Sequence, residues 1–277
     1  MQTTRHHRKV MTVCVIIVAV FTIWTLIPIL LLLMQSVKPE GVMFADPPQF
    51  FFQPTGVHFT KIFTRNNIMD NMINSIIVAV STMLLCVVLG SICAYSLARI
   101  RVVGSKFIAF FIILTRMVPV SALMLPMYVL MRKIGIANTY LAVIFAHTTL
   151  NLPFTVLMMK GFFRDVPLEL EQAAQVDGCS RLRTFLKICL PLTAPGLATT
   201  GIMVLLNSWN EFMFALVLTG RETRTLPVGI SSFVGSVSID WGASSAAATL
   251  ATLPIFVAGV FIQKYFVRGL TGGAVKG

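Results

Sequence analysis

Charge is scarce in this chain. Only 12% of its 277 residues are Asp, Glu, Lys or Arg, and just 10 are acidic, whereas 56% are hydrophobic. A water-soluble domain of this length does not need so apolar a composition, so the scarcity excludes an ordinary soluble protein and predicts a membrane protein. The net charge of +12 comes from bases beside apolar runs, which is typical of topology signals, so no nucleic-acid partner is expected.

Patterns that accompany catalysis and metal binding are also missing. The five cysteines form no C-x-x-C pair, which favours packing over a disulfide or a metal site. No histidine cluster has metal-ligand spacing, and His6, His7 and His58 are expected in exposed segments and receive no role. No nucleophile–base arrangement and no G-x-x-x-x-G-K-[ST] loop occur. The chain is therefore predicted to be no enzyme and to bind no metal or cofactor of its own, so energy for any transport comes from a partner or a gradient.

Long apolar runs dominate the sequence instead. A membrane-spanning helix needs about 20 mostly apolar residues. The first run is too long for a signal-peptide core and lacks a small-x-small cleavage site, so it is interpreted as an uncleaved span. The predicted fold is an all-α, polytopic membrane protein with six transmembrane helices. These lie at about 11–34, 74–98, 107–130, 138–162, 191–219 and 246–267.

Lysine and arginine predict the orientation of these spans. If the N-terminal segment 1–10 is inside, the segments on its side hold roughly twice as many Lys and Arg residues as the segments on the other side. Both termini, including the tail 268–277, are therefore expected in the cytoplasm. The polar loop 164–190 is expected there too.

Proline and small residues predict irregularities and contacts in the spans. Pro119 and Pro126 are expected to break the third span, Pro153 the fourth and Pro254 the sixth, since neighbours or water can satisfy the freed backbone groups. A small-residue stripe at i, i+4 and i+8 of the second span favours a close helix contact. It consists of Gly90, Ala94 and Ala98.

The loop 164–190 is the most informative segment because it is charged and patterned between two apolar runs. Asp165 is predicted to N-cap a helix that has Pro167 near its start and runs to about Val176. Gly178 is expected to end it, because glycine accepts positive φ.

Ser180 is expected to cap a second helix in this loop. That helix has one apolar face at i, i+3, i+4 and i+7. The face consists of Leu182, Phe185, Leu186 and Cys189. A compact helix–turn–helix of this kind on a membrane protein suits docking to a soluble partner.

The same loop carries a resemblance to a known family. Its ordered residues resemble the EAA loop of ABC importer permeases: Glu171, Gln172, Ala173, Ala174, Asp177, Gly178, Ile188, Leu190 and Pro191. Further segments are similar to the carbohydrate branch of those permeases: 208–212, 225–229, 241–242 and 265–277. Nearly the whole chain thus resembles carbohydrate-uptake (MalG-like) permeases, which are binding-protein-dependent inner-membrane components with a MetI/MalG-like fold.

The resemblance implies a multi-pass subunit of the bacterial inner membrane that takes up a sugar or sugar derivative. Implied partners are a second permease in a heterodimer, two ABC ATPase subunits that hold ATP and magnesium, and an extracytoplasmic solute-binding protein. The EAA loop would pass ATPase closure to the spans and produce alternating access.

Coupling to the ATPase is implied for Glu171, Gln172, Ala173, Ala174, Asp177 and Gly178. The family glutamate falls on Gln172 here, so either Glu171 takes over its contact or a neutral hydrogen bond suffices. The tail is implied to reach the ATPase dimer interface through Gly269, Thr271 and Lys276.

Polar residues inside the spans are the candidates for a translocation path, since such groups usually face the bundle interior or water. They are Arg116, His147, Asn151, Asn207, Trp209, Asn210 and Glu211. Alternatives stay open for five of them. His147 and Asn151, at i and i+4 on one face of the fourth span, line the path or make a satisfied helix–helix contact. Glu211 either lines the path or holds the helix bundle together by hydrogen bonds. Trp209 either stacks on a sugar ring or packs against neighbouring side chains. Arg116 either acts in the path or its gate or forms a structural pair with another residue.

Three rival functions remain. A gradient-driven carrier would favour paired intramembrane acids or internal repeats, but only Glu211 is present and no repeat is visible. A permease of the same superfamily for another solute, such as glycerol phosphate or an amino acid, is a second rival, and Arg116 makes an anion conceivable. A membrane enzyme is disfavoured by the absence of a catalytic constellation.

Overall fold

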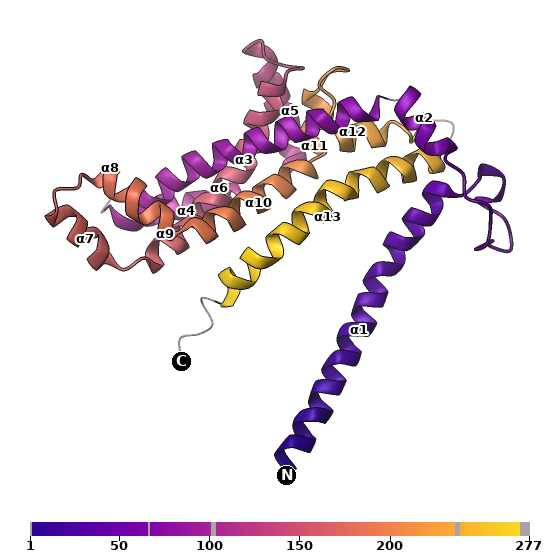
Figure 1. Cartoon of the computed structure of the whole chain (residues 1–277). Coiled ribbons are helices and arrows are strands. Elements are labelled where there is room, and N and C mark those ends of the chain that lie inside the picture. The colour runs from indigo at the N-terminus through magenta and orange to yellow at the C-terminus, as the bar shows by residue number, and fades with distance from the viewer. Residues whose placement is uncertain (1, 66, 101–103, 236–238, 272–277) are drawn as a thin grey trace. The chain divides into compact units, whose positions relative to one another are not determined.

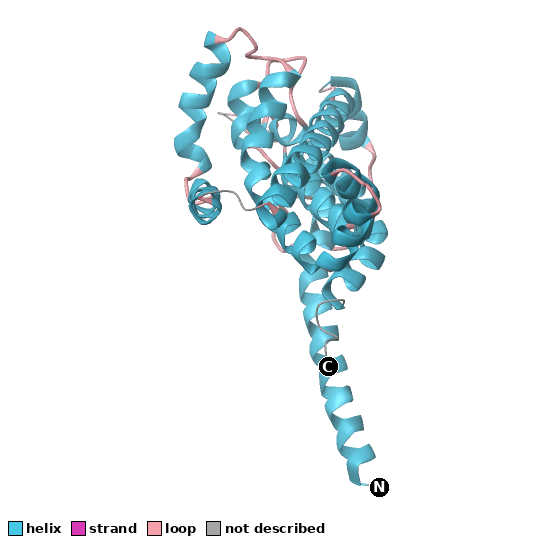
Figure 2. Cartoon of the chain, turned by 90° about the vertical axis from the view of Figure 1, so that its left-hand side faces the viewer, coloured by secondary structure: helices cyan, strands magenta, loops and turns pink. Residues whose placement is uncertain are grey.

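The computed structural model describes residues 2–65, 67–100, 104–235 and 239–271, and every regular element in these ranges is helical (Figure 2). The predicted all-α class is confirmed. Two short elements are irregular helices: η1 is a 3₁₀ turn and η2 a π-helix. The elements are α1 Gln2–Val37, η1 Glu40–Val42, α2 Val57–Arg65, α3 Ile68–Arg99, α4 Ser105–Thr115, α5 Val120–Lys133, α6 Tyr140–Asp165, α7 Leu168–Val176, α8 Arg181–Thr184, η2 Phe185–Cys189, α9 Leu190–Leu192, α10 Ala194–Trp209, α11 Met213–Leu218, α12 Leu226–Ser231 and α13 Trp241–Thr271.

The chain divides into two compact units. One contains residues 1–68 and 230–252, and the other contains residues 69–229 and 253–277. In the larger unit α6 packs against α10, and α11 packs against α5 and α6. The elements α7 and α8 lie at one end of the α3, α6 and α10 bundle (Figure 1). This arrangement separates the predicted coupling loop from the helix break that carries the intramembrane polar residues.

Three of the predicted spans are single helices that are long and apolar enough to cross a membrane: α1, α3 and α6. The predicted third span is a bent pair instead, because α4 and α5 meet at 97°. The predicted fifth span contains α10 and α11 and is interrupted at residues 210–212. Near its predicted start, the segments 181–192 and 194–209 meet at 78°. The sixth predicted span lies within α13, which begins earlier than expected because the Asp240 carboxylate accepts the Ala243 amide at 3.0 Å. The count of six crossings stays a prediction.

The proline predictions were right at one position and wrong at three. Pro119 follows the break between α4 and α5 and is the N-cap residue of α5. Pro126, Pro153 and Pro254 do not end their helices and lie inside α5, α6 and α13. Long membrane helices accommodate such prolines because neighbouring groups satisfy the carbonyl that loses its donor.

The predicted small-residue stripe does bring two helices together. A Cβ placed on Gly90 of α3 would lie 2.5 Å from Cγ2 of Thr155 on α6, and Ala94 is fully buried. The hydrophobic cluster beyond it includes Tyr95, Phe163 and Phe185. The missing side chain at Gly90 therefore sets how closely α3 and α6 approach.

Changing Gly90 to alanine is expected to destabilise the chain by about 1–3 kcal/mol, because the added methyl overpacks against Thr155. Gly161, also helical, has open space around a built Cβ. There, alanine is expected to be neutral or to add about 0.5–1 kcal/mol from helix propensity. Thermal unfolding of both variants in detergent checks the difference. Equal unfolding midpoints for the two would contradict a close contact at Gly90.

Segment 225–229, part of the family resemblance, docks on the start of α3. The Leu226 amide donates to the Ser75 hydroxyl at 2.8 Å, and a Cβ on Gly229 would overlap the Asn71 side chain. The Asn74 amide donates to the backbone carbonyls of Glu222 and Arg224 at 2.8 and 2.9 Å. These hydrogen bonds hold the segment after α11 against the start of α3.

Candidate functional site

A polar cavity of about 420 Å³ lies at the break between α4 and α5, where α6 and α10 also contribute. Its polar lining comprises Thr115, Arg116, Thr149, Asn151, Asn207 and Glu211. Four of the seven residues predicted for a translocation path thus line one cavity. An apolar wall with a few convergent polar groups is the usual composition of a small-ligand site.

Glu211 sits where the chain leaves α10 and begins α11. Its carboxylate accepts the backbone amides of Phe214 at 2.9 Å and Ala215 at 3.1 Å. Amides at the start of a helix have no partner within that helix, so an upstream carboxylate stabilises them. The side chain of Glu211 therefore satisfies backbone amides at the break in the predicted fifth span, between α10 and α11.

The same carboxylate contacts His147 of α6. Nε2 of His147 lies 2.8 Å from Oε2 of Glu211, and Nδ1 lies 2.7 Å from the Ser208 hydroxyl. A carboxylate only accepts, so Nε2 carries the proton and, in the neutral ring, Nδ1 accepts from Ser208. His147 is fully buried, and in this structure it makes a helix–helix contact between α6 and the end of α10.

Two amide side chains extend this network towards the cavity. Asn151 donates to the carbonyl of His147 at 2.9 Å, and Asn207 donates to the side-chain oxygen of Asn151 at 3.2 Å. Asn151 is buried and Asn207 is exposed. The network leaves polar atoms of both amides to face the cavity they line.

Arg116, at the end of α4, also lines the cavity. Its guanidinium lies 5.6 Å from the Phe154 ring centroid, a cation–π distance. Among the residues that the structure describes, no carboxylate lies within ion-pairing distance of it. The structural partner of Arg116 in this conformation is thus the Phe154 ring and not a carboxylate.

Three path candidates do not line this cavity: His147, Trp209 and Asn210. Trp209 is only 4% exposed, so its ring packs in the core and the sugar-stacking alternative is wrong in this conformation. Asn210 is exposed, and its side chain donates to the Leu206 carbonyl at 2.9 Å at the end of α10.

The predicted coupling loop has most of the expected helix–turn–helix. Helix α7 ends at Val176, and Gly178 has φ +84°. The Ser180 hydroxyl accepts the Arg183 amide at 3.3 Å, as a cap of α8 should. The predicted cap at Asp165 is wrong because α6 continues to that residue. Val166 is extended before Pro167, as residues before proline tend to be, and Pro167 itself precedes α7.

The predicted apolar face of the second helix is only half buried. Phe185 and Cys189 are buried, whereas Leu182 is 67% exposed and Leu186 also exposed. Residues 185–189 form a π-helix, whose wider turn shifts side chains off the 3.6-residue period. The exposed leucines therefore lie on the outer surface of the loop.

Glu171 is an internal anchor of this loop rather than a surface group. It is 2% exposed, accepts the Tyr95 hydroxyl at 2.9 Å and pairs with Nε of Arg99 at 2.5 Å. Arg99 also donates to the carbonyl of Val166. Both partners belong to the end of α3, so the pair ties the loop to that helix.

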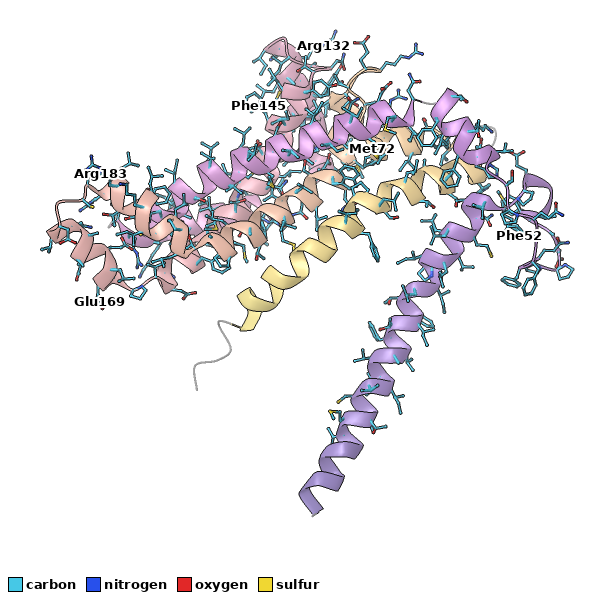
Figure 3. All side chains as sticks on the ribbon, viewed as in Figure 1. Phe52, Met72, Arg132, Phe145, Glu169 and Arg183 are labelled. Carbon is cyan, nitrogen blue, oxygen red and sulfur yellow. The ribbon has the colours of Figure 1, made fainter. Side chains whose placement is uncertain are left out.

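The other predicted coupling residues are divided between the two faces of α7. Ala174 is buried beside Glu171, and the remaining four are exposed: Gln172, Ala173, Asp177 and Gly178. Glu169 of α7 and Arg183 of α8 project from the same loop (Figure 3). The face available to a partner thus carries Gln172 and not Glu171.

Only two of the three residues predicted for the tail contact lie in the described part of the chain. Gly269 and Thr271 belong to α13, which extends past the expected end of the span at 267. Lys276 lies outside the described residues.

Sequence reasoning missed two groups of residues. Tyr95 and Arg99 lie at the end of the predicted second span, and their bonds to Glu171 join positions 76 and 72 residues apart. Glu40, His58 and Asp240 offer ligand atoms within 4.8 Å of one another, although no metal-ligand spacing occurs in the sequence. Neither group carries a local signal.

Comparison with known proteins places the chain in a family. The sequence profile described as "Binding-protein-dependent transport system inner membrane component" matches residues 86–272. The sulfoquinovosyl glycerol transport system permease protein SmoH of Agrobacterium fabrum is 34% identical over 91% of this chain and 89% of its own length. The trehalose/maltose transport system permease protein MalG of Thermococcus litoralis is 35% identical over 85% of this chain and 88% of its own.

A solved structure agrees on the fold. The bacterial ABC transporter involved in import of the acidic polysaccharide alginate contains a chain that matches with a TM-score of 0.79. The match covers 94% of this chain and 97% of that one at 20% identity. The MetI-like permease fold and the predicted resemblance are confirmed: this chain belongs to the family of inner membrane components of binding-protein-dependent transport systems.

Proposed function

We propose that this chain is one permease subunit of an ATP-driven importer for a sugar or sugar derivative. The observation that carries the proposal is its similarity, over about nine-tenths of the chain, to permeases named for glycoside transport. The expected assembly contains a second permease, two ATPase subunits and an extracytoplasmic solute-binding protein. ATP and magnesium belong to the ATPase subunits, and this chain supplies half of the pathway.

The coupling loop is proposed to seat its exposed face in the ATPase. Gln172, Ala173 and Gly178 give that face small or neutral groups, which permit close backbone approach to a groove. Glu171 supports the contact from inside, because its bonds to α3 convert movement of the loop into movement of a span. The alternative in which Glu171 itself touches the ATPase is disfavoured by its burial.

The cavity at the break between α4 and α5 is proposed as the part of the path that receives the sugar. Asn151, Asn207 and Glu211 offer amide and carboxylate groups to sugar hydroxyls, and the apolar wall suits the CH faces of a pyranose. A gradient-driven carrier is less well supported. Its proton-carrying acid would have to be Glu211, which is already committed to His147 and two backbone amides.

Reconstitution tests the proposal. The chain, its second permease and the ATPase are placed in proteoliposomes with ATP inside and the binding protein with labelled sugar outside. Uptake is expected to require both ATP and the binding protein and to survive an ionophore. Uptake that needs no ATP and stops with the ionophore would replace the proposal with a gradient-driven carrier.

A single substitution at Gly178 is expected to uncouple the complex. Its φ of +84° disfavours any side chain, and aspartate adds a charge to the exposed turn. Gly178→Asp is expected to reduce sugar-stimulated ATP hydrolysis at least about tenfold, since an unpaired charge at an interface costs more than about 1.4 kcal/mol. Gly135→Asp is the matched control, because Gly135 has φ +79° and equally open surroundings at the end of α5. Equal losses in both variants would remove the coupling role from the turn.

An anionic sugar derivative is a second candidate substrate, favoured by one observation. Arg116 lines the cavity with no carboxylate partner among the described residues. Arg116→Gln is expected to raise the half-saturating concentration of an anionic sugar about tenfold or more and to leave a neutral sugar unaffected, because a hydrogen bond to a charged group contributes about 1.5–3 kcal/mol. Competition of sulfonated, uronic and neutral sugars in the same uptake assay distinguishes the two. Equal effects on all of them would reject the anionic candidate.

A further inference from the structure

A buried histidine in the smaller unit has one ring nitrogen without a partner. His58 lies in α2 and is 1% exposed. Its Nε2 contacts the Lys38 carbonyl at 2.9 Å, so this nitrogen carries the proton. Nδ1 then holds a free lone pair, and it has no hydrogen-bond partner although it is buried. Buried polar atoms are nearly always satisfied, which makes an unpartnered imidazole lone pair informative.

Two carboxylates lie beside this ring. Glu40 in η1, His58 in α2 and Asp240 before α13 offer ligand atoms that are all within 4.8 Å of one another. The Asp240 backbone amide donates a hydrogen bond to the Phe233 carbonyl at 3.0 Å, and the Asp240 side chain caps α13 by accepting the Ala243 amide. Three segments distant in sequence thus converge on one point.

The carboxylates are reachable from outside. A cavity of about 320 Å³ is lined by Glu40, Lys61, Asp240 and Trp241, among others. The ring of His58 lies against Gly242, where a Cβ would overlap it. Glycine at 242 therefore leaves the space that the imidazole occupies.

Charge at the cluster is consistent with a cation. The Lys61 ammonium pairs with Asp240. The Lys61 ammonium thus lies beside the Asp240 carboxylate, where a bound cation would lie.

We propose that Glu40, His58 and Asp240 form a binding site for a divalent transition metal ion, with zinc as the best match. One imidazole nitrogen and two carboxylate oxygens are zinc ligands, and three protein ligands leave a fourth position for water. Ligands about 2.1 Å from a tetrahedral zinc lie about 3.4 Å apart, so the side chains must draw together. The exposed Glu40 side chain is free to rotate, and Lys61 must release Asp240. The bound ion would fasten η1, α2 and the start of α13 to one another.

The test is zinc binding by the full chain in detergent, after chelator treatment and with His6 and His7 changed to glutamine to remove an adventitious site. Metal analysis and competition with a chromophoric chelator are expected to give one zinc per chain. Glu40→Gln is expected to weaken binding at least about tenfold, and His58→Gln to abolish it. Lys61→Met is expected to tighten binding, because it frees Asp240.

Asp46→Asn is the matched control, since Asp46 is an exposed acid of the same unit. Glu40 is exposed as well, so its substitution leaves folding intact and keeps the result readable if His58→Gln misfolds. The proposal is overturned if the His6 and His7 variant takes up no stoichiometric zinc. It is also overturned if Glu40→Gln binds zinc as tightly as Asp46→Asn.

Discussion

Replacing Glu171 with alanine is expected to uncouple ATP hydrolysis from sugar uptake and to destabilise the chain by about 3–5 kcal/mol. The side chains of Arg99 and Glu171 are only 13% and 3% exposed, so removal of the carboxylate leaves a guanidinium in a largely dry site. The Tyr95 hydroxyl loses its acceptor as well. Since these bonds attach the loop to the end of α3, their loss frees α7 to move without moving the span.

Two further variants separate anchoring from surface contact. Gln172→Ala changes the neighbouring exposed residue and is expected to leave stability unchanged while weakening coupling. The double variant Arg99→Met, Glu171→Met replaces the ion pair with apolar groups of similar volume, which often restores stability. Thermal unfolding and sugar-stimulated ATP hydrolysis are measured for each. If Glu171→Ala retains wild-type coupling and stability, the anchor role of the pair is wrong.

Features with local signals were predictable from the sequence. The positive φ at Gly178 follows from glycine, which adopts this conformation at little cost. The cap at Ser180 follows from serine, which is a preferred N-cap residue. The close approach at Gly90 follows from small residues one helical turn apart. The wrong cap at Asp165 conflicts with another local signal. Val166 precedes Pro167 and is therefore biased away from helical backbone, so a helix boundary is expected at Val166.

Other features depend on contacts that no local pattern encodes. The partners of Glu171 are more than 70 residues away in the chain, so its burial is invisible in the loop sequence. The π-helix at 185–189 breaks the period on which the apolar face was predicted. His58 meets Asp240 only because the chain returns to the smaller unit after residue 230. Tertiary placement, rather than residue type, decides these cases.

Replacing Glu211 with alanine is expected to abolish uptake and to cost about 3 kcal/mol or more of stability. Three donors lose their acceptor at once: Nε2 of His147 and the amides of Phe214 and Ala215. A buried donor left without an acceptor costs about 1–3 kcal/mol. This variant alone does not separate a substrate contact from a structural tie, because both would be lost together.

Glu211→Gln separates the two roles. A carboxylate has about four acceptor positions, and three are used within the chain, which leaves one for a sugar hydroxyl in the cavity. Glutamine keeps the shape and two of the three internal bonds: with its oxygen at the Oε2 position it accepts from His147 and Ala215, and only the Phe214 amide loses its acceptor. Stability is then expected to fall by about 1–2 kcal/mol, less than for alanine, whereas the half-saturating sugar concentration rises about tenfold. Unfolding midpoints and uptake kinetics are measured together. If Glu211→Gln unfolds like wild type and transports with wild-type saturation, Glu211 only holds α6 to α10 and α11, and the sugar contacts must lie with Asn151, Asn207 and Arg116.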